Sequence, residues 1–262
     1  MEFTDILYHT ADRVATVTFN RPDYGNAWAE HTTAEVLRAL ERAAKDDAVG
    51  AIVITGAGKH FCAGGDINRF KRLIDTKVFL ERVNILRAGR MASAISKCPK
   101  PTIAMINGAA AGAGCAVALA CDFRVATAKS KMAMSFIKMG LSGDTGAFYY
   151  LQRLVGIAKA THLWMTGDLL TGEEAYAAGL VTVLAEEGAL EEETRAFAGK
   201  LAHGPGFAIA KQKALIAEFF HNDLDAYLDR EGQYMEDCSK TEDFAEAVTA
   251  FLSKRAPKFT GR

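Results

Sequence analysis

Residues 102–122 read TIAMINGAAAGAGCAVALACD and place an apolar strand, a glycine-rich turn and a helix of small residues in direct succession. The apolar run 102–106 is typical of a strand buried on both faces, as in a parallel sheet. The glycines allow a tight turn, and a helix that begins near Gly112 would point free amides away from its N-terminus. This succession predicts an α/β protein whose backbone approaches a ligand closely at the turn.

The same succession occurs once earlier in the chain. The apolar run 50–55 predicts a buried strand, and it is followed by the glycine-rich turn 56–66, which reads GAGKHFCAGGD. Upstream, alternating residues over 14–18 predict a strand, and apolar side chains spaced three and four apart over 30–46 predict an amphipathic helix. We therefore expect a repeated strand-to-helix unit.

Secondary structure in the remaining segments is predicted from hydrophobic periodicity and from the positions of glycines, which tend to end helices and strands. A charged helical stretch covers residues 78–95, and a strand covers residues 123–126. From Thr145 onward the pattern is mainly helical, interrupted by a short strand at 180–184. The last third of the chain is therefore expected to form a helical layer.

Composition excludes several classes of protein. The 262 residues are 50% hydrophobic and 24% charged, with 31 basic and 32 acidic side chains and a net charge of -1. Such a balance creates no field that would attract nucleic acid or an anionic membrane. The N-terminus has no secretory pattern, the apolar stretch 108–121 is too short to span a bilayer, and the five cysteines lack metal spacing. We expect a cytoplasmic, reduced protein without a metal site.

Each glycine-rich turn has two possible roles. Neither is a phosphate-binding loop, because the second turn has Val117 where a GxGxxG fingerprint needs its third glycine, and no GxxxxGK with Ser or Thr occurs. One role is close packing of a helix on a strand. The other is functional, since two helix starts that converge on one oxygen would form an oxyanion hole.

Four landmarks occur in a fixed order along the chain: Arg21-Pro22 with Asn26-Ala27, residues 61–67 (FCAGGDI), residues 101–122, and the segment from Gly140 onward. With these landmarks the chain resembles the crotonase (enoyl-CoA hydratase/isomerase) superfamily over essentially its full length. The turn 110–114 and the tail 250–261 are most similar to the branch of ring-epoxide (1,2-epoxyphenylacetyl-CoA) isomerases. The resemblance implies a spiral of repeated ββα units over residues 1–200, a helical region over 201–262, and a homotrimer or homohexamer that uses this region.

The resemblance also implies roles for individual residues. The backbone amides of Gly65 and Ala113 would hold the thioester oxygen, and each donor in such a site supplies roughly 3–4 kcal/mol of transition-state stabilisation. The groove for coenzyme A would be lined by Ala63, Asp66 and Ile67. Lys254, one turn after Phe251, would reach the CoA of a neighbouring subunit, although a solvated terminal lysine is the alternative.

Departures from the family pattern bear on the reaction. Family hydratases have two glutamates, and the corresponding positions here are Ala116 and Phe136. Without both carboxylates, efficient addition of water is not expected, because it needs activated water and a proton donor. Asp144 matches the aspartate of the ring-epoxide isomerases, and Phe136 and Phe148 are expected to form an apolar wall that desolvates it. The alternative is that Asp144 caps the helix that follows.

The favoured function is an acyl-CoA isomerase in which Asp144 moves a proton, with CoA as part of the substrate and no metal or redox cofactor. Alternatives are an atypical hydratase, an enzyme similar to 4-chlorobenzoyl-CoA dehalogenase, and a CoA-ester binding protein without activity. The dehalogenase needs a histidine between the two turns and a tryptophan at position 136, and this chain has neither. His60 and His162 are expected at the surface, and Trp164 and the cluster 148–150 in the core or a pocket wall.

Overall fold

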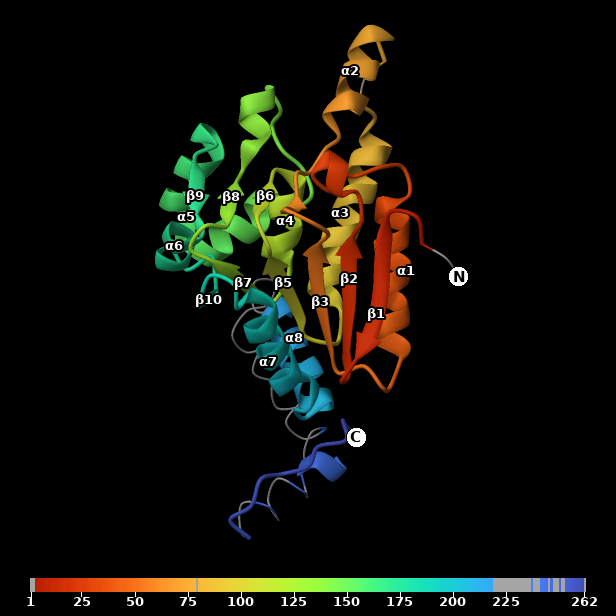
Figure 1. Cartoon of the computed structure of the whole chain (residues 1–262), viewed down its shortest axis with the longest axis vertical. Coiled ribbons are helices and arrows are strands. Elements are labelled where there is room, and N and C mark those ends of the chain that lie inside the picture. The colour runs from red at the N-terminus through yellow and green to blue at the C-terminus, as the bar shows by residue number, and fades with distance from the viewer. Residues whose placement is uncertain are drawn as a thin grey trace.

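The computed structural model describes residues 3–78, 80–218, 237, 241–244, 246, 250 and 253–261. Ten strands of this described part form two sheets (Figure 1). The larger sheet has the spatial order β1 (Ile6–Ala11), β2 (Val14–Phe19), β3 (Ala51–Gly56), β5 (Thr102–Ile106), β7 (Phe123–Thr127) and β10 (Val183–Ala185). The smaller sheet has the order β4 (His60–Cys62), β6 (Ala109–Ala111), β8 (Lys131–Ala133) and β9 (Leu169–Thr171).

Both sheets are mostly parallel. Only β1 in the larger sheet and β9 in the smaller sheet run antiparallel to their neighbours. Consecutive strand pairs divide between the sheets, because β3, β5 and β7 join the larger one whereas β4, β6 and β8 join the smaller one. Each pair is followed by helical structure, so the chain advances as a spiral of ββα units, and the expected α/β fold class is confirmed.

Helical segments connect and follow these strands. They are η1 (Pro22–Tyr24), α1 (Thr32–Lys45), α2 (Ile67–Asp75), α3 (Arg82–Lys97), α4 (Ala113–Ala120), η2 (Ser135–Met139), α5 (Ala147–Thr166), α6 (Gly172–Ala177), α7 (Leu190–Ala202) and α8 (Gly206–Glu218). The main core lies between one face of the sheet and α1, α3 and α4, and α7 covers the other face. In Figure 1, α2 lies beyond the carboxyl ends of β2 and β3.

The local sequence explains how much of each of these elements is buried. Every residue of β3 is buried, as expected for an apolar run in the middle of a parallel sheet. Every residue of α4 is buried too, because its alanines and glycine let neighbouring backbone come close on all sides. Helix α1 buries only the stripe that contains Val36, Ala39, Leu40 and Ala43.

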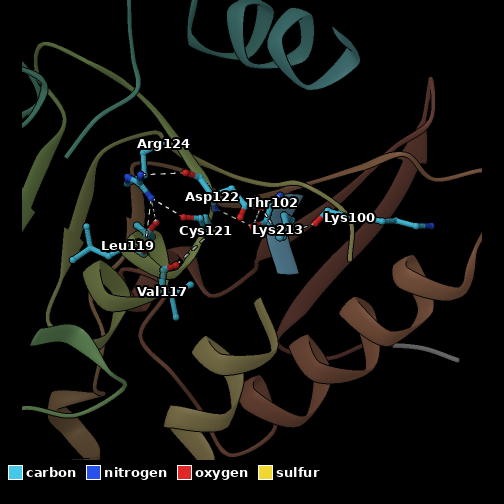
Figure 2. Close-up of polar contacts among 9 residues, drawn as sticks. Lys100, Thr102, Val117, Leu119, Cys121, Asp122, Arg124 and Lys213 are labelled. Atoms are coloured by element: carbon cyan, nitrogen blue, oxygen red, sulfur yellow. Dashed lines mark hydrogen bonds and ion pairs between the residues drawn. The ribbon is translucent and has the colours of Figure 1, made fainter. Parts of the chain in front are cut away.

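A buried arginine holds the carboxyl end of α4 (Figure 2). The guanidinium of Arg124 donates to the carbonyls of Ala118, Leu119, Cys121, Asp122 and Leu180. A helix leaves its last carbonyls without partners, and a cation there also interacts favourably with the helix dipole. Burial nevertheless lowers the pKa of Arg124, because the charge is removed from water.

The adjacent Asp122 links α8 to the carboxyl end of α4. Its carboxylate accepts from the amide and hydroxyl of Thr102 and forms an ion pair with Lys213 of α8 (Figure 2). Lys213 also donates to the carbonyl of Lys100 at 3.0 Å. The first helix of the expected C-terminal region is therefore anchored to the core, whereas most of residues 219–262 lie outside the described residues. The division at residue 200 stays a prediction.

The expected strands and helices of the larger sheet and its core are present with shifts of a few residues. The helix expected from residue 78 begins at Arg82, and the strand expected at 180–184 covers Val183–Ala185. The smaller sheet was not predicted, because its strands have only three residues each and two of them lie inside the glycine-rich turns. Such strands are too short to show a period.

Two helical glycines provide a matched pair of stability tests. A Cβ on Gly114 of α4 would overlap with the backbone carbonyl of Cys62, whereas nothing lies within 4 Å of a Cβ on Gly89 of α3. We expect Gly114→Ala to lower the free energy of unfolding by about 1–3 kcal/mol through overpacking. Gly89→Ala should raise it by about 0.5–1 kcal/mol through backbone entropy. Urea unfolding measures both, and equal effects would contradict the close approach at Gly114.

Candidate active site

The two glycine-rich turns lie side by side. Strands β4 and β6, which lie inside these turns, pair in parallel with Cys62 opposite Ala110, so the residues after each strand lie at the same end of the pair. Gly64 has a φ of 84°, and a Cβ there would lie 2.7 Å from the carbonyl oxygen of Ala111 and 3.0 Å from the amide nitrogen of Ala113. Only glycine allows this contact, which brings the two expected amide donors to one place.

Both amides are available to a ligand. Ala113 is the first residue of α4, where amides have no partner within the helix. Within the described part of the chain, neither the Gly65 amide nor the Ala113 amide donates to a protein acceptor. The N-terminal end of α4 carries the positive end of the helix dipole, which favours an oxygen that gains negative charge. The arrangement can therefore stabilise an enolate oxygen.

Phe70 of α2 covers the turn that carries Gly65, and this residue was not predicted from the sequence. A Cβ on Gly65 would lie 2.6 Å from the Phe70 ring, so the ring is in direct contact with the glycine. Phe70 itself is half-buried. The signal in the sequence is weak, since it is a single aromatic residue five positions after the glycine. The ring is a candidate wall next to the Gly65 amide.

The other residues expected in the CoA groove have different environments. Ala63 is exposed on the same turn as Gly65, and Ile67 is exposed at the first position of α2. Asp66 is buried, and its carboxylate caps α2 by accepting from the amides of Asn68 and Arg69. It also pairs with Arg21 at 3.2 Å. Although burial raises the pKa of Asp66, these hydrogen bonds and Arg21 together hold it below its usual value. The Asp66 side chain therefore stabilises the start of α2.

A cavity of about 480 Å³ lies beside this turn, lined by Arg21, Tyr24, Asp66, Asn68, Lys71, Arg72 and Asp75. Four of these residues lie on one face of α2 at helical spacing, and two of the four are cationic. No role for Lys71 or Arg72 was predicted from the sequence, in which no helix was expected between the first glycine-rich turn and residue 78. Cations at this position can meet a phosphate group.

Asp144 is partly removed from water. It lies in the loop between η2 and α5, and its Oδ1 accepts a hydrogen bond of 2.7 Å from the Thr145 hydroxyl. Burial raises the pKa of Asp144 above its usual value, and the Thr145 hydroxyl partly opposes that shift. Helix α5 begins after Gly146 without a side-chain cap, so the alternative that Asp144 caps this helix is wrong.

Aromatic rings lie between the loop that carries Asp144 and the second glycine-rich turn, at Gly112. The Phe136 ring would lie 3.4 Å from a Cβ on Gly143 and 3.8 Å from one on Gly112, so it spans the distance between the two loops. Trp164 packs against Phe136 and Phe148 with ring centroids 5.7 and 5.4 Å apart. These half-buried rings form an apolar wall next to the loop that carries Asp144.

The two positions that hold glutamates in family hydratases contain no carboxylate. Ala116 is fully buried inside α4, and Phe136 belongs to the aromatic wall. His60 is exposed, and the exposed His162 pairs with Asp168 at 2.9 Å. In the described part of the chain no group of three His, Cys, Asp or Glu side chains could hold a metal ion.

The expected role of Lys254 stays a prediction. Lys254 is exposed, and Phe251 lies outside the described residues. The segment 253–261 lies at the end of the molecule opposite α2 (Figure 1). This segment is therefore distant from the CoA groove expected on the same chain.

Two adjacent amide-bearing turns beside a desolvated carboxylate, on a spiral of ββα units, are the features of a crotonase-type enzyme. The chain belongs to the enoyl-CoA hydratase/isomerase family, whose model matches residues 9–262. The resemblance found in the sequence is thereby confirmed, and the protein is an enzyme of this family. No helix among the described residues is long and apolar enough to cross a membrane.

Relatives carry both isomerase and hydratase names. The chain is 34% identical to the trans-2-decenoyl-[acyl-carrier-protein] isomerase of Streptococcus mutans and 35% identical to the 1,2-epoxyphenylacetyl-CoA isomerase of Escherichia coli, each over 100% of both chains. An enoyl-CoA hydratase structure from Polaromonas sp. JS666 superimposes with a TM-score of 0.89 at 32% identity, covering 97% of this chain and 99% of that one. The family is shown, and both reaction types occur among its members.

The desolvated carboxylate leads to a stability prediction. Because the folded state raises the pKa of Asp144, ionisation costs stability at every pH above the unfolded value of about 3.9. Asp144→Asn should therefore unfold at a higher temperature than the wild type at pH 7.5. The gain should be about 2–4 °C for each kcal/mol by which the folded state disfavours the ionised carboxyl. It should shrink as the pH falls through the raised pKa and vanish below about pH 4.

Asp168→Asn is the matched control for calorimetry. Asp168 is exposed, and hydrogen bonds with Thr166 and His162 lower its pKa, so the substitution should not raise the unfolding temperature. A midpoint for Asp144→Asn below that of the wild type would show that the carboxylate makes a stabilising contact.

Proposed function

We propose that this enzyme is an acyl-CoA thioester isomerase that moves a proton along the acyl group by way of an enolate. The thioester oxygen lies between the amides of Gly65 and Ala113, and Asp144 removes a proton from one carbon and returns it to another. The observation that carries the proposal is that Asp144 is a partly desolvated carboxylate, whereas Ala116 and Phe136 replace the glutamate pair of family hydratases.

The two turns perform the electrostatic part of this reaction. Removal of a proton next to a thioester transfers negative charge to the carbonyl oxygen, and two fixed amides stabilise it without reorganisation. Each donor contributes roughly 3–4 kcal/mol to such a transition state. The contact at Gly64 holds the two turns together and so keeps the donors in place before the substrate binds.

Asp144 performs the proton transfer. A carboxylate at its usual pKa is a weak base, and burial beside an apolar wall raises its pKa toward the operating pH. The same group must also release the proton to the product, which a carboxylic acid does readily. One acid/base group is sufficient for an isomerisation, whereas hydration also requires an activated water.

The cavity beside α2 supports CoA as the carrier of the acyl group. Arg21, Lys71 and Arg72 line it, and cations of this kind bind phosphate groups. The proposed reaction moves only protons, so it requires no metal or redox cofactor, and CoA is part of the substrate. A cytoplasmic homotrimer or homohexamer, without nucleic acid or membrane partners, completes the proposal.

Proton exchange in deuterated water tests the reaction. Purified wild type, Asp144→Asn and the control Asp168→Asn are incubated with 2-enoyl, 3-enoyl and aryl-acetyl CoA thioesters, and products are identified by mass spectrometry. We expect interconversion of 3-enoyl and 2-enoyl thioesters with deuterium uptake in the wild type and the control. Asp144→Asn should lose about 100- to 10,000-fold of the rate, the usual contribution of a general base.

Each other outcome has a definite meaning. If 3-hydroxyacyl-CoA is the main product, the enzyme is a hydratase that uses Asp144 with a bound water. If Asp144→Asn retains full exchange, another group is the base. If no thioester in the panel exchanges protons, the proposed reaction is refuted for these substrates.

A second prediction concerns the binding of CoA. Reversing one charge in the cavity, by Arg72→Glu, should raise KM for a CoA thioester about tenfold, which is within the range for loss of one charge-assisted hydrogen bond. The value of kcat should stay unchanged, because the phosphate contact is equally strong in ground and transition states. Arg195→Glu, on the exposed side of α7, reverses the same charge away from the cavity and should leave KM unaltered. Equal KM values for all three proteins would place CoA elsewhere.

A further inference from the structure

Thr145, directly after Asp144, has an unusual backbone conformation. Its φ is 58°, in the left-handed region, and its side chain is branched at Cβ. Branched residues are genuine outliers at positive φ, and such conformations persist only where the surroundings enforce them. Thr145 is also buried, with only 3% of its surface exposed. Glycine or asparagine would adopt this backbone with less strain.

The surrounding loop enforces the conformation. Gly143 has a φ of 98° and Gly146 a φ of 72°, so glycines with positive φ lie on both sides. A Cβ on Gly143 would overlap with the Trp164 ring, and a Cβ on Gly146 would lie 3.0 Å from the Tyr150 ring. Both rings therefore cover the loop closely. Two of the three positions with positive φ are glycines, and the third carries a side chain that touches the carboxylate.

The Thr145 hydroxyl donates to Oδ1 of Asp144 at 2.7 Å. Among the described residues this is the one hydrogen bond of the Asp144 side chain, so without it the carboxylate would be free to change rotamer. The first amide of α5, that of Ala147, donates to the backbone carbonyl of Asp144 and holds the backbone of this residue, not its carboxylate.

We propose that Thr145 is a positioning residue, whose strained backbone and buried hydroxyl hold Asp144 by Oδ1 and leave Oδ2 free for proton transfer. This inference rests on the proposed role of Asp144 as the base. The residue acts through the carboxylate and does not touch the reacting atoms. The hydroxyl also stabilises the ionised form, which opposes the effect of burial.

Few groups act on the pKa of Asp144. Phe136, Trp164 and Tyr150 pack on its loop, and none of them is charged at neutral pH. Burial and the Thr145 hydroxyl are the two causes that act on its pKa, and no charged group of the described elements contributes. A change at Thr145 should therefore appear directly in the acid limb of the pH–rate profile.

Three variants separate the hydroxyl from the backbone strain. Thr145→Val keeps the branched shape without the hydroxyl, Thr145→Ser keeps the hydroxyl, and Thr145→Gly removes both the strain and the hydroxyl. We expect Thr145→Val to lower kcat for deuterium exchange about tenfold and to move the acid limb up by roughly one pH unit, the size of one hydrogen bond to a charged group. Thr145→Ser should restore the position of the limb. Thr145→Gly should unfold no more easily than the wild type and still lose activity.

A ¹³C NMR titration of labelled aspartate, with the Asp144 signal assigned from its loss in Asp144→Asn, measures the carboxyl pKa without any turnover. A higher pKa in Thr145→Val than in Thr145→Ser supports the inference even if Asp144 is not the base. Equal pKa values and equal acid limbs in the two variants overturn it. If the pKa differs as expected while Asp144→Asn retains exchange, the proposed function fails and the positioning contact stands.

Discussion

The rest of the structure depends on a contact between two stretches of backbone. At Gly64 and Gly114 the loop after β4 meets the start of α4 with no room for a side chain on either glycine. This contact aligns the Gly65 and Ala113 amides, and it requires that both short strands end at the same edge of the smaller sheet. The fully buried α4 and the spiral of ββα units place these ends together, so the proposed oxyanion hole would be a property of the fold itself.

The two ends of α4 have opposite electrostatic tasks. Its N-terminus offers unpaired amides to an anionic oxygen, whereas Arg124 neutralises the carbonyls at its other end. Asp122 and Lys213 extend that anchor to α8. The helix that presents the Ala113 amide is thus held at its carboxyl end by buried polar contacts, which restrict how far its N-terminus can shift. This rigidity is what preorganised catalysis needs.

The loop that carries the proposed acid/base residue, Asp144, contains features that lower the stability of the folded protein. A desolvated carboxylate and a branched residue at positive φ both oppose folding, and they occur at adjacent positions, Asp144 and Thr145. Elsewhere, as in β3 and α4, burial and conformation agree with local preference. Conflicts of this kind are expected at functional sites, where the surrounding core stabilises what the local sequence does not favour.

The sequence alone predicted the α/β class, the buried strands β3, β5 and β7, and the two glycine-rich turns. These features could be predicted because apolar runs and glycines determine the conformation of the segment in which they occur. The family resemblance pointed to Asp144, Gly65 and Ala113 as candidates. The smaller sheet, the ring of Phe70 over Gly65 and the cations of α2 beside the cavity escaped prediction. They arise from contacts between distant segments, which leave no period in the chain. Whether Asp144 caps a helix or stays free, and the strain at Thr145, could be decided only by the tertiary structure, since burial, φ and the choice of hydrogen-bond partner depend on what packs around the loop.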